Sequence, residues 1–271
     1  MSTPTASSTP SEPTVQKLFD LTGKVVLITG GCGHLGSAMS RALAEAGASV
    51  VLTSREAARA EAAAAQLPGP TKHHGIVLDQ MDPSSIERGW NEALSRAGRI
   101  DALVNNGHEA LAADWTTVTA EQFSRQLANA TGYFLLARLT RDHAVARKAP
   151  ASIIMLGSMY GLVGSYPDAY AGITNASPVA YHTLKGGILH MTRHLAVYWA
   201  GDGVRVNCLS PGPFPSEKAD QQMVVRLCTN SPMKRMGVPS ELKGAIVFLA
   251  SDASSYMTGQ NLVIDGGWTS W

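Results

Sequence analysis

Short apolar runs alternate with longer mixed stretches along the chain. The short runs are rich in aliphatic and β-branched residues, a composition that is typical of buried strands. The predicted strands are Val25–Thr29, Ser49–Thr53, Gly75–Leu78, Ala102–Asn105, Ser152–Leu156, Val204–Leu209 and Asn261–Ile264.

The longer stretches between these strands predict helices. They are Leu35–Ala46, Arg55–Gln66, Ser84–Ala97, Ala120–Arg147, Val179–Ala200 and Ser240–Ala250. Strands that alternate with helices in this way predict a parallel sheet covered by helices on both faces. Neither a repeat nor a Pro, Gly or Ser-rich linker divides the chain, so we predict a single α/β domain over residues 21–271. Residues 1–20 begin with Ser, Thr and Pro and predict a disordered tail.

The composition and charge of the chain argue against some classes of partner. The 271 residues are 45% hydrophobic and carry a formal net charge of +1, with no block of like charges. This balance argues against nucleic-acid partners and an anionic membrane surface, and favours a small-molecule substrate. The three cysteines form no CxxC pair, which predicts no disulfide framework and no metal site. With no secretory signal and no apolar run long enough to span a bilayer, we expect a cytoplasmic protein.

The first candidate site is the turn Thr29-Gly-Gly-Cys-Gly-His-Leu-Gly36, between the first predicted strand and helix. Gly30, Gly33 and Gly36 allow a pyrophosphate to approach the backbone closely, and the helix N-terminus supplies free N–H groups. An ordinary tight turn needs glycine for the same conformational reason. The turn alone therefore leaves both interpretations open.

A second candidate site combines Ser158 with Tyr181 and Lys185. Tyr181 and Lys185 are four residues apart, so they share one face of the predicted helix. An ammonium about 4 Å from a phenol, at an effective dielectric near 20, favours phenolate by about 4 kcal/mol, or about three pKa units. We therefore expect Lys185 to lower the pKa of Tyr181. The alternative is a half-buried tyrosine beside a solvated lysine.

These motifs, taken in order, resemble the short-chain dehydrogenase/reductase family in its compact single-domain branch. The resemblance runs from about residue 21 to the end of the chain and implies a doubly wound, Rossmann-like sheet. The residues that carry it are the glycine turn, Leu78-Asp79, Ile100-Asp-Ala-Leu-Val-Asn-Asn106, Asn129-Ala-Thr-Gly132, Ser158, Tyr181, Lys185, Val206-Asn-Cys-Leu-Ser-Pro-Gly212, Phe248-Leu-Ala-Ser251, Thr258-Gly-Gln260 and Asp265-Gly-Gly267.

The resemblance implies NAD(P)-dependent interconversion of an alcohol and a carbonyl compound. Ser158 would donate a hydrogen bond to the substrate oxygen, and Tyr181 would transfer the proton during hydride transfer at nicotinamide C4. Lys185 would lower the pKa of Tyr181 and hold the nicotinamide ribose. Asn129 would position a water that links Lys185 to solvent.

The resemblance also implies a set of cofactor-binding residues. They are Gly30, Cys32, Gly33, His34, Leu35, Gly36, Ser54, Arg55, Asp79, Gln80, Asn105, Gly107, Tyr181, Lys185, Pro211, Gly212, Phe214 and Ser216. The second predicted strand is followed by Ser54 and Arg55, without the acidic residue that binds the adenine ribose of NAD. We therefore expect a preference for NADP, with NAD possible, because Arg55 can neutralise a 2′-phosphate. Alternatively, Arg55 is a solvated residue at a helix start.

Two histidines depart from the family pattern. His34 follows Gly33 where the single-domain branch usually has glycine, and it lies near the cofactor phosphates or is merely exposed. His108 stands where the family usually has glycine, and would reshape the floor beneath the nicotinamide. His190 and His194 have the spacing of a metal pair, but they point away from Tyr181 and are predicted to serve packing or an interface.

The substrate is predicted to be a small sugar, polyol or sugar acid. Pro211–Ser216 and the ending Asp265–Trp271 look most like gluconate-type dehydrogenases, and we expect a homo-oligomer, a tetramer or a dimer. The segment Gly161–Pro178 would select the substrate or would pack against a neighbouring subunit; its candidate polar groups are Tyr166, Asp168, Tyr170, Thr174 and Asn175. A 3-oxoacyl carrier-protein reductase is the alternative function. A catalytically silent nucleotide-binding regulator is disfavoured because all four catalytic positions are filled.

Overall fold

The structure, a computed structural model, describes residues 12–111 and 113–270. Within these residues a seven-stranded sheet has the order β3-β2-β1-β4-β5-β6-β7, and every neighbouring pair is parallel. The strands are β1 Val25–Ile28, β2 Ser49–Ser54, β3 His74–Val77, β4 Ala102–Asn105, β5 Ala151–Leu156, β6 Val204–Pro211 and β7 Asn261–Ile264.

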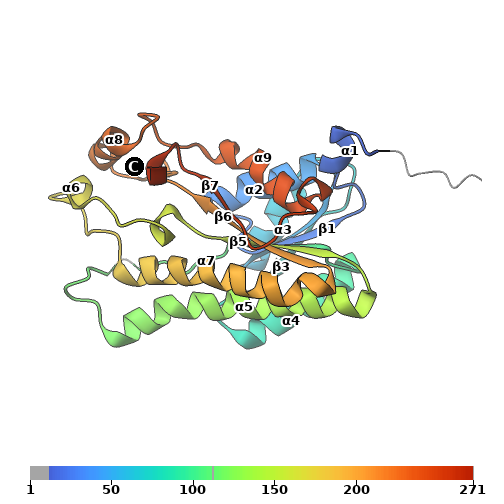
Figure 1. The fold of residues 1–271 in the computed structure, drawn as a ribbon. Coiled ribbons are helices and arrows are strands. Elements are labelled where there is room, and N and C mark those ends of the chain that lie inside the picture. Colours follow the sequence, from blue (N-terminus) through green and yellow to red (C-terminus); the bar gives the residue numbers. More distant parts are fainter. Residues whose placement is uncertain (1–11, 112, 271) are drawn as a thin grey trace, which may run out of the picture.

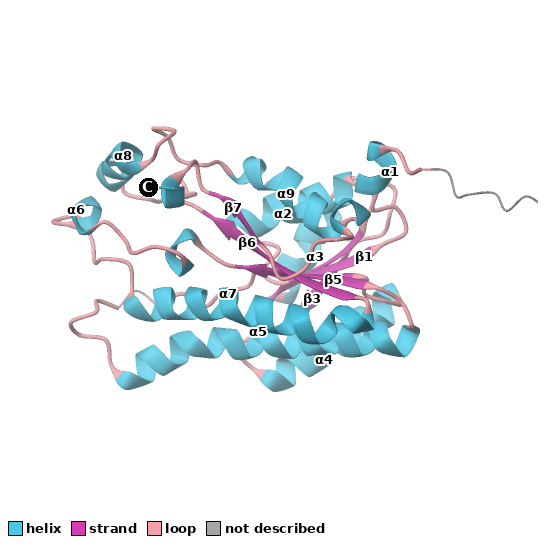
Figure 2. Ribbon diagram, viewed as in Figure 1, coloured by secondary structure: helices cyan, strands magenta, loops and turns pink. Residues whose placement is uncertain are grey.

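Helices cover both faces of the sheet (Figures 1 and 2). One layer is formed by α2 His34–Glu45, α3 Ala57–Ala65 and α9 Lys243–Ala250, and the other by α4 Pro83–Ala97, α5 Ala120–Arg147 and α7 Val179–Trp199. Three shorter helices lie outside these layers: α1 Val15–Phe19, α6 Pro167–Tyr170 and α8 Gln221–Asn230. Helices α6 and α8 lie on the left in Figure 1, toward which the arrowheads of β6 and β7 point.

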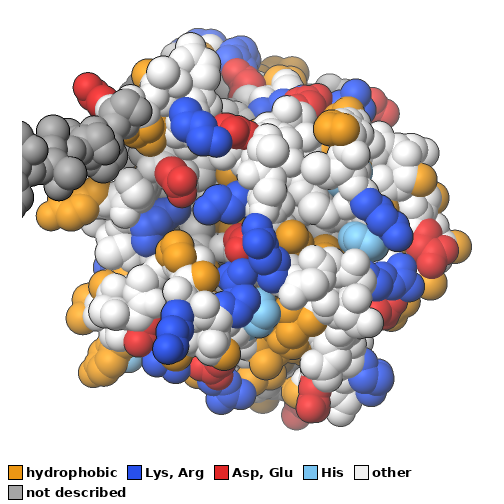
Figure 3. All heavy atoms as spheres, turned by 90° about the vertical axis from the view of Figure 1, so that its right-hand side faces the viewer, with side chains coloured by type: hydrophobic (Ala, Val, Ile, Leu, Met, Phe, Trp, Pro, Cys, Tyr) orange, Lys and Arg blue, Asp and Glu red, His pale blue; other side chains and the backbone are white. Residues whose placement is uncertain are grey.

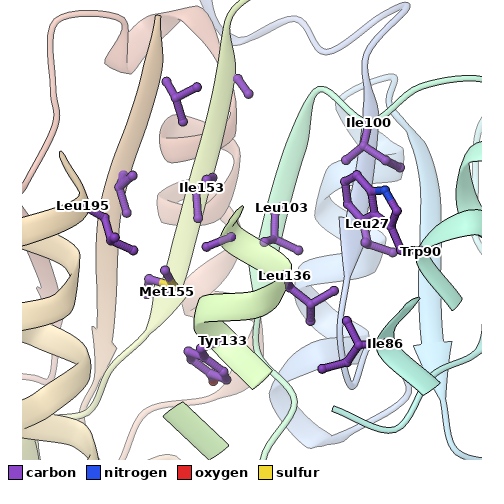
Figure 4. Packing of buried hydrophobic residues seen from close by; sticks show 14 of the residues in the cluster. Leu27, Ile86, Trp90, Ile100, Leu103, Tyr133, Leu136, Ile153, Met155 and Leu195 are labelled. Carbon is purple, nitrogen blue, oxygen red and sulfur yellow. The ribbon is translucent and has the colours of Figure 1, made fainter. Parts of the chain in front are cut away.

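The central strands are mostly apolar because both of their faces are covered. All four residues of β1 and of β4 are buried, and so are all six of β5. From the α4–α5–α7 layer, Trp90 lies beside Leu27 and Ile100, and Leu136 lies beside Leu103 of the sheet (Figure 4). Burying a Leu-sized side chain contributes about 1.5–3 kcal/mol, so this core fixes the positions of the strand ends.

The strand order places a crevice beside β1. The chain runs from β1 toward β3 on one side and from β4 toward β7 on the other, so the connections diverge between β1 and β4. In sheets of this kind, ligands bind outside the carboxyl ends of the strands at this point. Thr29, after β1, ties the two strand ends together, since its Oγ1 accepts from the backbone N–H groups of Asn106 at 3.0 Å and Gly107 at 2.8 Å.

The predicted fold is confirmed: each predicted strand and each predicted main helix overlaps an observed one. The last main helix is shorter, because Pro239–Leu242 forms a 3-10 turn before it. Helix α1 corrects the predicted tail at Val15–Phe19, whereas residues 1–11 lie outside the described residues. The side chain of Thr14 caps α1, and the ring of Phe19 lies 6.2 Å from that of Phe248.

The surface carries charges of both signs. On the face seen in Figure 3, Lys and Arg side chains are interspersed with Asp and Glu. In the part of the chain that the structure describes, no helix combines the length and the apolar character needed to cross a membrane.

Candidate active site

A cavity of about 340 Å³ lies at the carboxyl ends of β1, β2 and β4. It is lined by eleven of the predicted cofactor-binding residues, Gly30, Cys32, Gly33, His34, Leu35, Gly36, Ser54, Arg55, Asp79, Gln80 and Gly107. Thr29, Thr53, Arg59, Leu78, Met81, Asn106, His108 and Glu109 complete the lining. The cavity therefore joins the glycine turn to the end of β2, as the sequence predicted.

The glycine turn forms the cavity wall beside helix α2. Gly30 has a φ of +60°, and a Cβ at Gly36 would lie 2.2 Å from the carbonyl oxygen of Gly30, so neither position accepts a side chain without strain. Gly33 is the N-cap of α2 and has no side chain to bond the first N–H groups of that helix. Unbonded N–H groups at a helix start favour an anion, so the turn fits a cofactor pyrophosphate. His34, the first residue of α2, is exposed and lines the cavity.

The far end of the cavity is basic. Ser54 and Arg55 line it as predicted, and Arg59, which the sequence analysis missed, joins them one helical turn later on α3. The guanidinium of Arg59 donates to the carbonyl oxygen of Cys32 at 3.2 Å, which holds it over the glycine turn. The i, i+4 spacing of the two arginines was the available signal. Two guanidinium groups and a hydroxyl at one end fit a 2′-phosphate.

Glu109 also lines this basic end. Both oxygens of its carboxylate accept from Arg125, at 2.6 and 2.9 Å, and Arg55 lies 4.0 Å from the second oxygen. Hydrogen bonding to Arg125, aided by its charge and that of Arg55, holds the pKa of Glu109 below its usual value. Glu109 therefore remains ionised, and its charge is largely taken up by Arg125.

The three predicted catalytic groups that meet are Ser158, Tyr181 and Lys185. Ser158 follows β5, and its Oγ accepts from the N–H of Tyr160 at 3.1 Å. Tyr181 and Lys185 lie one turn apart on α7, and the ammonium of Lys185 is 5.6 Å from the centroid of the tyrosine ring. The same ammonium donates to the carbonyl oxygen of Leu156 at 2.7 Å, so the lysine is anchored to the end of β5.

The electrostatics at Tyr181 correct one prediction. Burial raises the pKa of Tyr181, and hydrogen bonding to Ser158 lowers it in part. The expected net lowering by Lys185 is therefore wrong for this structure, since its ammonium faces the ring and the backbone of Leu156. Burial itself lowers the pKa of Lys185 from 10.5 to about 8, because the charged form has lost its water.

Asn129 is brought beside the cavity, but its side chain is fully occupied. Its Oδ1 accepts from Gln80 and from the N–H of Glu109, each at 2.8 Å. Its Nδ2 donates to the carbonyl oxygens of Glu109 and Gln126, at 3.1 and 2.9 Å. Since the amide has two acceptor sites and two donors, the predicted water relay would have to use the main chain of Asn129.

His108 connects the cofactor cavity to the catalytic groups. It lines the cavity, and its ring meets that of Tyr181 edge to face at a centroid distance of 5.4 Å. Burial, with a smaller contribution from the charge of Lys185, lowers the pKa of His108 to about 4. A neutral imidazole therefore stands beside Tyr181 at neutral pH, and its Nε2 lies 3.2 Å from the amide nitrogen of Gln126.

Some predicted cofactor residues lie elsewhere. Asn105 is corrected: it is fully buried, and its Nδ2 donates to the carbonyl oxygen of Tyr133 at 2.9 Å. It is the last residue of β4 and faces the core, whereas its neighbour Asn106 lines the cavity. Four residues at or after the end of β6 are not part of the cavity lining, and their contact with cofactor remains a prediction. They are Pro211, Gly212, Phe214 and Ser216.

The predicted substrate segment folds against its own chain. Tyr166 meets Trp268 edge to face at 5.3 Å, and Tyr170 bonds to Tyr160. Asp168, Thr174 and Asn175 are exposed. His190 and His194 are also exposed, and within residues 12–111 and 113–270 no three His, Cys, Asp or Glu side chains are grouped to hold a metal ion.

Known proteins of similar sequence include dehydrogenases and reductases. A family model described as Enoyl-(Acyl carrier protein) reductase matches residues 33–269. Galactitol 2-dehydrogenase (L-tagatose-forming) of Cereibacter sphaeroides is 36% identical over 267 residues, covering 94% of this chain and 98% of that protein. NADP-dependent mannitol dehydrogenase of Hypocrea jecorina is 34% identical over 270 residues, covering 93% and 94%.

Solved structures match over almost the whole chain. A short-chain type dehydrogenase/reductase from Mycobacterium marinum has a TM-score of 0.84 and 33% identity, covering 95% of this chain and 99% of that one. This chain belongs to the short-chain dehydrogenase/reductase family. A gluconate 5-dehydrogenase from Burkholderia cenocepacia, in complex with NADP and tartrate, has a TM-score of 0.83 and 29% identity, covering 94% and 99%. The resemblance carried by the motifs is confirmed, and the protein is an oxidoreductase that interconverts an alcohol and a carbonyl compound with a nicotinamide cofactor.

Proposed function

We propose that this short-chain dehydrogenase/reductase oxidises a sugar or polyol alcohol, or reduces the corresponding carbonyl, with a preference for NADP over NAD. The observation that carries the proposal is the joining of Ser158, Tyr181 and Lys185, through His108, to a cavity whose far end holds Arg55 and Arg59. The named relatives act on galactitol and mannitol, and one neighbouring structure contains NADP.

One set of residues would bind the cofactor, and a second set would transfer the proton. The glycine turn and the start of α2 would hold the cofactor pyrophosphate, and Ser54, Arg55 and Arg59 its 2′-phosphate. When bound, the nicotinamide supplies or accepts the hydride. The Oγ of Ser158 accepts from the N–H of Tyr160 and is hydrogen-bonded to Tyr181, so the serine hydroxyl lies beside the acid–base group and would donate to the substrate oxygen when substrate binds. Tyr181 exchanges a proton with that oxygen, and the ammonium of Lys185, which lies 5.6 Å from the centroid of the tyrosine ring, would bond the nicotinamide ribose.

A panel assay tests the proposal. Purified protein would be offered sugars, polyols, sugar acids, simple ketones and acyl thioesters, each with NADP(H) and NAD(H). We expect the highest kcat/KM on a polyol or sugar with NADP(H). Highest activity on a 3-oxoacyl thioester would favour the acyl carrier-protein reductase alternative, and equal use of both cofactors would contradict the assigned preference.

We further propose that the protein is a cytoplasmic homo-oligomer, and two observations support this. Val197 and Tyr198, near the end of α7, have exposed fractions of 77% and 70%, which supports burial of this helix end in a homo-oligomer, a dimer or tetramer. All three cysteines are free thiols, which supports a reducing compartment such as the cytoplasm. Light scattering would give the mass of the assembly, and a monomer at micromolar concentration would contradict the first point.

A further inference from the structure

Two tyrosines form a hydroxyl pair beside the catalytic residues. Tyr160 lies in the 3-10 turn Met159–Gly161, directly after Ser158, and Tyr170 is the last residue of α6. Their hydroxyl oxygens are 2.5 Å apart. The pair therefore joins the catalytic serine's own turn to the segment that lies beyond the carboxyl ends of the strands (Figure 1).

The surroundings hold both rings in place. Tyr160 and Tyr170 belong to the apolar cluster that also contains Tyr181, and the ring of Tyr160 stacks on that of His182 at 4.6 Å. Arg226 of α8 donates to two carbonyl oxygens of the α6 segment, those of Asp168 at 3.0 Å and Ala171 at 2.6 Å. The position of Tyr170 is thus set by α8 and that of Tyr160 by α7.

Counting protons shows that the pair keeps one unused donor. Burial raises the pKa of both Tyr160 and Tyr170, so both phenols are protonated at neutral pH. Two O–H groups share one hydrogen bond, which leaves one proton for another acceptor. Tyr160 is only 9% exposed and covered by His182, whereas Tyr170 is half-buried. Tyr160 thus donates to Tyr170, and an O–H whose oxygen already accepts a bond is a stronger donor.

We propose that Tyr170, polarised by Tyr160, donates a hydrogen bond to a second hydroxyl of the substrate, on a carbon adjacent to the one that is oxidised. The inference rests on the proposed function and makes Tyr170 a specificity-determining residue for vicinal diols. A substrate without the second hydroxyl leaves this half-buried donor without its partner in the bound complex, and a site built to bond a hydroxyl discriminates against the analogue that lacks it.

The test compares 2,3-butanediol with 2-butanol, both with NADP. Tyr170→Phe is expected to lower kcat/KM for the diol about tenfold, the range for one lost hydrogen bond in a desolvated site, and to leave kcat/KM for the mono-alcohol unchanged. Tyr160→Phe keeps the donor but removes its polarising partner, so a smaller loss of about threefold is expected on the diol alone. Tyr256→Phe, whose side chain is fully exposed and does not line the cavity, is the matched control and should behave as wild type.

The outcomes separate the inference from the proposed function. Equal losses on both alcohols, with the same loss for Tyr160→Phe and Tyr170→Phe, would assign the pair a purely structural role and overturn the inference. A wild-type enzyme that does not prefer the diol would also overturn it. The proposed function fails separately, if wild type turns over none of the sugars and polyols in the panel while it still oxidises one of these two alcohols.

Discussion

At the catalytic end of the site Lys185 is 4% exposed, and its ammonium lies 2.7 Å from the carbonyl oxygen of Leu156. At the basic end the side chain of Arg55 is 70% exposed and pairs with Glu109 at 4.0 Å. Both side chains carry a positive charge, to which we assign a role in the proposed function. Burial determines the electrostatics of Lys185, because the loss of hydration lowers its pKa, whereas water screens the exposed charge of Arg55.

Because of this difference in burial, we expect Lys185 to affect the rate of the reaction and Arg55 to affect the choice of cofactor. A buried charge is costly, so its removal alters both the chemistry and the stability of the fold. An exposed guanidinium costs the fold little, and its value appears only when a phosphate binds. Substitutions at the two ends should therefore have effects of different kind and of different size.

The largest expected effect is the loss of turnover in Tyr181→Phe. The substitution removes the hydroxyl that exchanges a proton with the substrate but keeps the ring that packs on His108. We expect kcat to fall by about 1,000-fold or more, with the Kd of NADPH unchanged. Steady-state kinetics and fluorescence titration would measure both. Tyr198→Phe, on the exposed end of α7, is the control, and a Tyr181→Phe enzyme with most of the wild-type kcat would refute the assigned role.

Lys185→Met should lower kcat about 100-fold or more and at the same time stabilise the fold. A pKa lowered from 10.5 to about 8 means that the buried ammonium costs about 3 kcal/mol at pH 7. The substitution also removes the hydrogen bond to the carbonyl oxygen of Leu156, which costs about 1 kcal/mol. The expected net increase in the free energy of unfolding is therefore about 2 kcal/mol. Urea denaturation at pH 7 would measure it.

The pH dependence of stability gives this second prediction an independent check. Between about pH 8 and 10.5 the unfolded chain binds more protons at Lys185 than the folded protein does, so wild-type stability should rise with pH across this window relative to Lys185→Met. The surface ion pair of Lys243 with Glu45 supplies the control, Lys243→Met, for which no stabilisation is expected. A less stable Lys185→Met protein would show that burial of the ammonium is not costly.

Arg55→Ala should have the smallest effect, confined to the cofactor. We expect NADPH to bind at least about tenfold more tightly than NADH to wild type, since a charge-assisted hydrogen bond contributes about 1.5–3 kcal/mol, and we expect the substitution to remove most of that difference. Arg59→Ala should act in the same direction with a factor of about three, because Arg59 also bonds to Cys32. Titration at two salt concentrations would measure these affinities.

The controls for this end of the site are an exposed arginine and the second cofactor. Arg41→Ala removes a guanidinium that pairs with Glu45 and does not line the cavity, so it should leave both affinities unchanged. The Kd of NADH should be nearly unaltered in Arg55→Ala. Parallel losses for NADPH and NADH would mean that Arg55 does not recognise the 2′-phosphate.

The sequence predicted those parts of the site that depend on chain order. The glycine turn and Arg55 lie at the ends of predicted strands, and Tyr181 and Lys185 share a helix face. Periodicity placed these residues, and the family resemblance supplied the roles expected of them. Asn105 and Asn106 show the limit of this reasoning. The bounds of β4 were predicted correctly, but the side chain of Asn105 turns into the core to bond Tyr133 of α5, and only Asn106 lines the cavity.

Long-range packing explains the remaining differences. The pKa of Tyr181 depends on how deeply several elements bury it, and three of the four bonds of Asn129 join it to the distant segments at Gln80 and Glu109. Helix α1 was missed because five residues show no helical period, and a ring contact with Phe248 stabilises it from the other end of the chain. Such contacts are set by the assembled fold and leave no local pattern.

The strand order also implies a sequence of events while the protein is being synthesised. The strands β3, β2, β1 and β4 form one half of the sheet, and every residue lining the cofactor cavity precedes residue 110. Ser158, Tyr181 and Lys185 come from the later half, which is added outward along β5, β6 and β7. Since chains emerge from the ribosome amino end first, the nascent protein acquires the surface that we assign to the nucleotide before it acquires the groups that we assign to the chemistry.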